Sequence, residues 1–224
     1  ARMLRAAAQG RDDPTVETLL AFSRSIDGGP NVLSARNDRN WQTCCVLCLS
    51  EDGDLLSQWR AYTPREGGYA IAFDGSALVA NMGGALGRVR YALVEQEALL
   101  APLVAYHIHL AQREPAFVVD GFILDRLYER ALLIKDSAFE EEREWRVIYP
   151  RVGLDALRFR PGKAIVRPYL PVCCEMRGVI QGVRVGPHGS QDTAVRVASM
   201  LLSRLNGCHN QAQRSVIPYR ILPH

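Results

Sequence analysis

The stretch that decides the fold is residues 43–74, which read TCCVLCLSEDGDLLSQWRAYTPREGGYAIAFD. The apolar run at 43–49 predicts a strand, and the acidic turn at 51–54 ends it. Residues 55–62 predict a short helix, and residues 69–73 predict a second strand after a loop. Because the first run is apolar on both faces, we expect it to be the central strand of a sheet.

The remaining strands and helices do not alternate strictly, which favours an α+β fold over a doubly wound one. We predict a mixed, largely antiparallel central sheet with flanking helices in a single domain of residues 1–224. Residues 1–42 would form a helix and a loop ahead of an α+β core at 43–224. The further predicted strands are 88–94, 143–149, 164–171, 178–185 and 214–221, and the helices are 13–26, 94–113, 117–136 and 190–206.

The composition is that of a globular protein. Of 224 residues, 48% are hydrophobic and 23% are charged, which is enough to bury one core. The net charge of +3 arises from 27 basic and 24 acidic residues that are scattered along the chain, so nucleic-acid binding is not implied. No apolar run reaches the roughly 18–20 residues that span a bilayer, and the start lacks the apolar stretch of a signal peptide. We therefore expect a cytoplasmic protein without membrane association.

Three of the six cysteines lie in the first predicted strand. The spacing of Cys45 and Cys48 occurs in zinc sites, but side chains three residues apart in a strand point to opposite faces. We expect buried, reduced thiols and no metal site.

The first candidate site follows this strand. Ser50 stands beside three carboxylates, and the next helix carries Trp59 and Tyr62 about one turn apart, followed by Gly68 and Tyr69. Polar groups combined with flat aromatic faces are suited to binding a planar ring.

These residues also have a structural interpretation. Ser50 or Asp54 would cap the helix, Trp59 would anchor the core, and the glycines would only permit a tight turn.

The second candidate site is the sequence Glu142-Arg143-Glu144-Trp145-Arg146. If 143–149 is a strand, alternation places Glu142, Glu144 and Arg146 on one face. Two carboxylates and a guanidinium in line bind a ribose hydroxyl, stabilise a cationic transition state or act as a general base. In the structural alternative, Glu144 and Arg146 form an ion pair of modest energy on a solvated face.

Three motifs stand in a fixed order along the chain. They are Cys48-Leu-Ser-Glu51 followed by Asp54-Leu-Leu-Ser-Gln-Trp59-Arg-Ala-Tyr62, Gly67-Gly-Tyr-Ala-Ile-Ala-Phe73-Asp74, and Glu142-Arg-Glu144-Trp145-Arg146. In this order and spacing they resemble the bacterial domain-of-unknown-function family 2971 (DUF2971), over about residues 43–185. The resemblance implies an accessory or defence-related bacterial protein. The N-terminal element that family members usually carry does not stand at the start of this sequence.

The order of the motifs in this family is similar to that in ADP-ribosyltransferases. The similarity is an analogy at the level of the fold. It implies NAD as the substrate, with Glu144 or Glu142 holding the ribose 2′-hydroxyl. The residues that would stack on the nicotinamide or support its pocket are Trp59, Tyr62, Tyr69 and Ser50. We expect an ADP-ribosyltransferase-like or NAD-glycohydrolase-like enzyme. Two alternatives stay open: a non-enzymatic binding or sensor module in bacterial defence that meets a protein partner, and a nucleic-acid-binding or metal-dependent nuclease domain.

Overall fold

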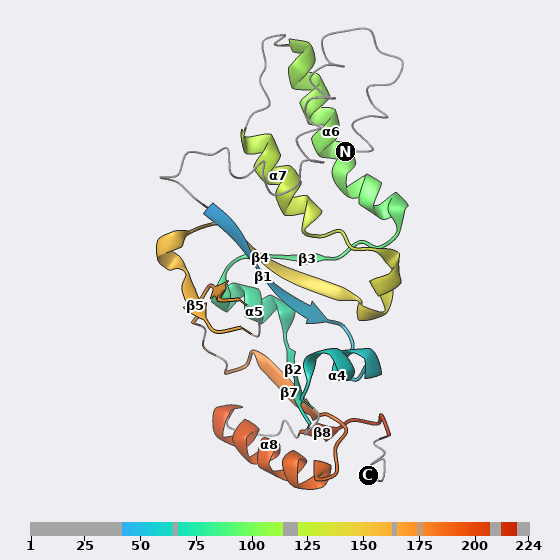
Figure 1. The fold of residues 1–224 in the computed structure, drawn as a ribbon, viewed down its shortest axis with the longest axis vertical. Coiled ribbons are helices and arrows are strands. Elements are labelled where there is room, and N and C mark those ends of the chain that lie inside the picture. The colour runs from blue at the N-terminus through green and yellow to red at the C-terminus, as the bar shows by residue number, and fades with distance from the viewer. Residues whose placement is uncertain are drawn as a thin grey trace. The chain divides into compact units, whose positions relative to one another are not determined.

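The computed structural model describes residues 42–64, 67–113, 121–162, 165–173, 175, 177–206 and 212–218. Helices and mainly antiparallel strands make up these residues, which confirms the α+β class (Figure 1). The helix predicted at 13–26 lies outside them. The described strands form three sheets, not one central sheet.

The chain divides into two compact units. Unit 1 takes the described residues within 1–45, Val89–Phe139 and Pro150–Leu170, and unit 2 takes those within Val46–Arg88, Glu140–Tyr149 and Pro171–His224. A single domain stays a prediction.

The first sheet has the strand order β1-β4-β3. Its strands are β1 (Gln42–Ser50), β4 (Glu144–Gly153) and β3 (Ala85–Arg88), and β3 pairs antiparallel with β4. Helix α5 (Gly75–Met82), which starts at the N-cap Asp74, contributes Leu78 to a core with Val147 and Val179. The prediction that β1 is central is wrong, because β4 holds that place. An apolar sequence indicates that a strand is covered by other parts of the protein, but it does not indicate which strands pair with it.

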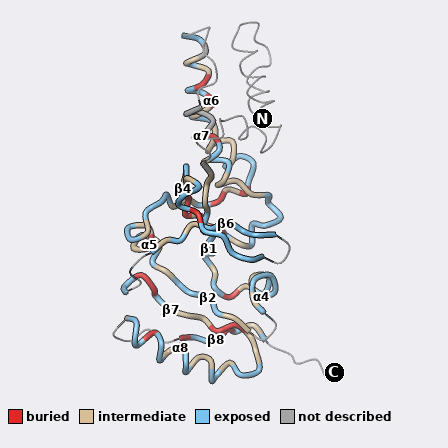
Figure 2. The backbone as a smooth tube through the Cα atoms, turned by 60° about the vertical axis from the view of Figure 1, so that its left-hand side comes forward, coloured by how far each residue is buried: buried red, intermediate tan, exposed pale blue. Residues whose placement is uncertain are grey.

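The second sheet belongs to unit 2 and has the order β2-β7-β8. Strand β2 (Tyr69–Phe73) pairs antiparallel with β7 (Ile180–Val185), and β7 pairs parallel with β8 (Gln213–Arg214). Helix α8 (Gln191–Asn206) packs along this sheet, as Figure 1 shows, and joins Ala198 and Leu202 to Ile180 and Val185 in a second core. In Figure 2, β7 and α8 carry buried positions in red, and most of the rest of α8 is coloured as exposed or intermediate. The short helix α4 (Leu56–Tyr62) precedes β2.

Unit 1 contains helices α6 (Leu93–Arg113) and α7 (Gly121–Ala131), which contact each other, and a hairpin-like pair of strands, β5 (Arg158–Arg160) and β6 (Arg167–Tyr169). The 3-10 helices are η1 (Ser137–Glu142), which runs from unit 1 into unit 2, and η2 (Leu154–Ala156). In the described residues, no helix has the length and apolarity that crossing a bilayer requires.

The structure differs from the prediction at several elements, among them the strand at 88–94 and helix α5. The strand predicted at 88–94 is wrong, because β3 ends at Arg88 and α6 begins at Leu93. Between them, Arg90 makes only a single parallel bridge with Ile134. Helix α5 was not predicted, although Asp74 is a standard N-cap residue whose side chain accepts a hydrogen bond from the Ala77 amide at 2.8 Å.

Candidate functional site

The start of the first candidate site lies beside the start of the second in unit 2. The end of β1 lies beside the start of β4, where the Ser50 hydroxyl donates to the Glu142 carbonyl at 2.8 Å. The Glu51 amide donates to the Arg143 carbonyl at 3.2 Å, and the Trp145 indole N–H donates to the Glu51 carboxylate at 2.8 Å. Segments that are more than ninety residues apart in sequence are therefore tied together by backbone and side-chain bonds.

Glu144 and Arg146 form a bidentate ion pair on β4. Nε of Arg146 donates to Oε1 of Glu144 at 3.1 Å, and its terminal nitrogen donates to Oε2 at 2.9 Å. Glu144 is only 5% exposed. An arginine that donates two hydrogen bonds to one carboxylate is among the stronger hydrogen-bonded arrangements in proteins. The contact also confirms that strand alternation places these two side chains on one face. Glu144 is buried and Arg146 is partly buried, so the pair does not lie on a solvated face as the structural alternative assumed.

Cys48 on β1 lies close enough to this pair to contribute to the pKa of Arg146. Burial alone would lower the pKa of Arg146, but the bond to Glu144, the Glu144 charge and Cys48 outweigh it and raise the pKa. The guanidinium is therefore charged at any physiological pH. We refer to Cys48, Glu144 and Arg146 as the β4 ion-pair site.

Cysteine burial differs from the sequence prediction. Cys44 and Cys45 are half-buried, whereas Cys48 and Cys173 are exposed. The expectation of buried thiols is therefore wrong for the last two. Cys48 lies on a strand that is not central, and Cys173 lies outside the helices and strands.

Glu142 is separated from the ion pair by a change in the backbone. It ends η1, and Arg143 has a φ of 40°, a left-handed conformation that interrupts the strand alternation. The Arg143 side chain turns to Asp52 at 3.3 Å. The prediction that Glu142 lies on the strand, in line with Glu144 and Arg146, is wrong for this reason.

A second polar cluster surrounds Asp54, which is 9% exposed. Its Oδ1 accepts from the Trp59 indole at 2.8 Å and from the Ser215 hydroxyl, and its Oδ2 accepts from Arg184 at 3.0 Å and from the Val216 amide at 2.8 Å. One carboxylate therefore joins α4, β7 and the segment after β8. We refer to these five residues as the Asp54 cluster.

The protonation of Asp54 follows from these bonds. Burial would raise the pKa of Asp54, but the bonds from Ser215, Val216, Trp59 and Arg184 together outweigh it and hold the pKa below its usual value. Asp54 does not cap α4, since the N-cap is Leu55 and no side chain bonds there.

The aromatic residues of the first candidate site lie in different surroundings. Trp59 is 6% exposed, and its ring packs so closely on Gly186 that a Cβ there would lie 3.0 Å from ring carbons. Tyr62 and Tyr69 are exposed. Gly68 is held by its carbonyl, which accepts from the Gly186 amide at 2.8 Å. Trp59 thus serves as the core anchor of the structural interpretation, and only the two tyrosines present open rings.

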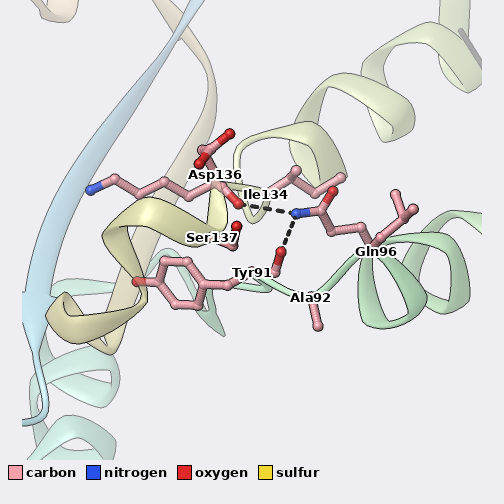
Figure 3. A pocket seen from close by; sticks show the side chains of 8 residues that line it. Tyr91, Ala92, Gln96, Ile134, Asp136 and Ser137 are labelled. Carbon is pink, nitrogen blue, oxygen red and sulfur yellow. Dashed lines mark hydrogen bonds between the residues drawn. The ribbon is translucent and has the colours of Figure 1, made fainter.

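Unit 1 has a pocket of about 480 Å³ that contains none of the predicted site residues. The Gln96 amide holds its walls together by donating to the carbonyls of Tyr91 and Lys135 at 2.9 and 3.0 Å (Figure 3). These residues carry no signal in the sequence, because a pocket formed by a helix start and a distant turn leaves no local pattern. The residues that line it are Tyr91, Ala92, Leu93, Gln96, Ile134, Lys135, Asp136 and Ser137.

Fold and site together define an α+β protein with two buried carboxylates, each held by an arginine on a strand. Residues 58–147 match the family model described as "Protein of unknown function (DUF2971)". This match confirms the resemblance over a shorter range than the predicted 43–185; it includes Trp59, Glu144 and Arg146 and leaves out Asp54. Neither a curated protein nor a solved structure matches the chain significantly.

Proposed function

We propose that the β4 ion-pair site binds the ribose and phosphate of NAD, and that the protein is an ADP-ribosyltransferase-like or NAD-glycohydrolase-like enzyme. The observation that supports this proposal is the bidentate Glu144–Arg146 pair on the central strand of the first sheet. Desolvation makes a buried ion pair a poor source of stability, so its presence favours a role in binding or chemistry.

The two side chains have complementary chemistry for such a ligand. The guanidinium of Arg146 carries a positive charge that suits a phosphate, and the carboxylate of Glu144 accepts hydrogen bonds from hydroxyls. The two bonds from Arg146 fix the orientation of the Glu144 carboxylate before any ligand binds. A fixed charge stabilises a developing cation without reorganising during the reaction.

The reaction that this residue pair supports is cleavage of the bond between ribose C1′ and the nicotinamide nitrogen. Nicotinamide leaves with the bonding electron pair, and C1′ gains oxocarbenium character that the Glu144 carboxylate stabilises. In hydrolysis, water attacks C1′ and releases one proton, and the products are ADP-ribose and nicotinamide. In transfer, a nucleophile of an acceptor molecule takes the place of water.

The test is NAD binding and nicotinamide release by the purified protein and by Glu144→Gln. The substitution keeps an oxygen and the side-chain size but removes the charge, so we expect release to fall by a factor of about 100 or more. Glu141→Gln is the matched control, because Glu141 is exposed on η1, and we expect its rate to equal that of the unmodified protein. Thermal unfolding of each variant shows whether it is folded.

A folded protein that neither binds NAD nor releases nicotinamide would contradict the proposal. Equal loss of activity in Glu144→Gln and Glu141→Gln would also contradict it, since the effect would then not be specific to the ion pair.

A further inference from the structure

Helix α8 covers only part of the second sheet. One flank of α8 is fixed to β8, because the Ser199 hydroxyl accepts from the Ala212 amide at 3.0 Å and Asp192 pairs with Arg214 at 3.2 Å. Residues two positions apart on a helix point in nearly opposite directions. The flank opposite Ser199 carries Val197 and Leu201, which therefore lie toward β2.

The facing side of β2 is apolar and open. In the antiparallel register Tyr69 is opposite Val185 and Ile71 is opposite Val183, and opposite residues point to the same face. Val185 and Val183 belong to the core under α8, so Tyr69 and Ile71 point to the face that α8 covers. They are nevertheless 57% and 49% exposed, because the helix lies over β7 and β8.

These side chains form one surface, which we name the α8–β2 groove and define as Tyr69, Ile71, Val197 and Leu201. Val197 and Leu201 are 49% and 57% exposed and one helical turn apart. The four side chains come from one strand and one helix of unit 2.

The backbone of β2 is open at the same place. Within the described chain, β7 is the neighbour of β2 and no strand lies on its other side. The Gly68 carbonyl accepts from Gly186, so by antiparallel alternation Ala70 also bonds to β7 while Tyr69 and Ile71 direct their N–H and C=O groups outward. The strand has no charge or proline, the features by which edge strands usually resist pairing.

The charges next to the groove indicate the partner. Arg204 lies one turn beyond Leu201 on the same flank, and among the described residues it forms no ion pair. The acidic residue of α8, Asp192, is already paired on the opposite flank. An approaching segment therefore meets apolar side chains and an unneutralised arginine.

We propose that an extended, acidic segment of a partner protein pairs with β2 as a fourth strand. Its backbone would bond to Tyr69 and Ile71, alternate apolar side chains would enter the α8–β2 groove, and a carboxylate would meet Arg204. This surface is separate from the β4 ion-pair site and does not depend on any activity there.

The test uses two synthetic peptides of eight residues, one alternating valine with glutamate and the other alternating valine with lysine. The acidic peptide is expected to bind at least tenfold more tightly, and to slow the amide exchange of Tyr69 and Ile71 without changing that of Ala70, which already bonds to β7. Ile71→Asp is expected to weaken binding at least tenfold. Val94→Asp makes the same charge change at an exposed valine of α6 and is expected to leave binding unchanged.

Arg204→Gln tests the charge alone. It is expected to weaken binding of the acidic peptide about threefold, which is the scale of an exposed ion pair, and to leave the fold intact.

Three outcomes would overturn the proposal. The first is no binding of the acidic peptide by the folded protein, and the second is equal affinity for both peptides. In the third, the Tyr69 and Ile71 amides are already protected without peptide and the protein sediments as a dimer, which would mean that a second copy occupies the edge.

Discussion

At the scale of single residues, the Asp54 carboxylate is bonded by α4, β7 and the segment after β8. Four donors reach its two oxygens, and two of them, Arg184 and Ser215, lie 130 and 161 residues away in sequence. The sequence shows only an aspartate in a turn, and this local pattern predicts a capping role for Asp54. A carboxylate whose partners arrive from distant strands cannot be found by spacing.

Asp54→Asn is expected to destabilise the protein by about 3 kcal/mol at neutral pH, because it removes one charge of a largely buried pair. Chemical denaturation measures this free energy of unfolding. Asp192→Asn is the control, since its ion pair with Arg214 is exposed, and we expect a loss below about 1 kcal/mol. Equal losses for both variants would show that burial of Asp54 contributes little.

Comparing the unmodified protein with Asp54→Asn also gives a prediction for how stability depends on pH. The pKa of Asp54 is lowered in the folded state, so near pH 4 the unfolded chain takes up the proton first. The stabilising contribution of the carboxylate is therefore complete above about pH 4 and is lost as the pH falls through the folded pKa. The difference between the unmodified protein and Asp54→Asn should be constant from pH 5 to 7 and shrink toward pH 2. A difference that grows on acidification would contradict this assignment.

At the scale of elements, the sequence located most of the strands and helices of the described residues but not their neighbours. The turn after β1, the helix at Trp59 and the strand at Tyr69 follow from residue patterns, and the structure confirms them. Central or edge position does not follow from such patterns, because it depends on pairing between distant segments. The apolar run of β1 correctly predicts a strand but wrongly predicts a central position in the sheet. Val46 and Leu47 are each 37% exposed.

Two glycines at β7 give a matched test of packing at the element scale. A Cβ at Gly186 would press on the Trp59 ring at 3.0 Å, and the ring is held by its bond to Asp54. A Cβ at Gly182 meets nothing within 4 Å. Gly186→Ala is expected to cost about 1–3 kcal/mol of unfolding free energy. Gly182→Ala is expected to stay within about 0.5 kcal/mol, and the reverse order in urea denaturation would contradict the packing of Trp59.

At the scale of the whole molecule, the chain does not complete one unit before starting the other. It crosses between units 1 and 2 five times, after residues 45, 88, 139, 149 and 170. Strands β1 and β4 each contain residues of both units. Sequence composition gave no sign of this division, because no linker separates the units.

We expect a single cooperative unfolding transition for this reason. Opening one unit would break strands that also belong to the other, so the two units should lose structure together. Hydrogen exchange at increasing urea would measure opening free energies for the amides of Val104 in unit 1 and Val147 in unit 2. The two values should converge on one global value, and values that stay apart by several kcal/mol would instead show two independent domains.

The Asp54 cluster also has a consequence for biosynthesis. Ser215 and Val216 are made 161 and 162 residues after Asp54, so the carboxylate has only part of its donors while the ribosome is still adding the segment in between. A buried carboxylate without its donors is unstable, because it has lost water and gained too little in return. The Asp54 cluster can therefore be completed only after Ser215 and Val216 have been synthesised and have left the ribosome.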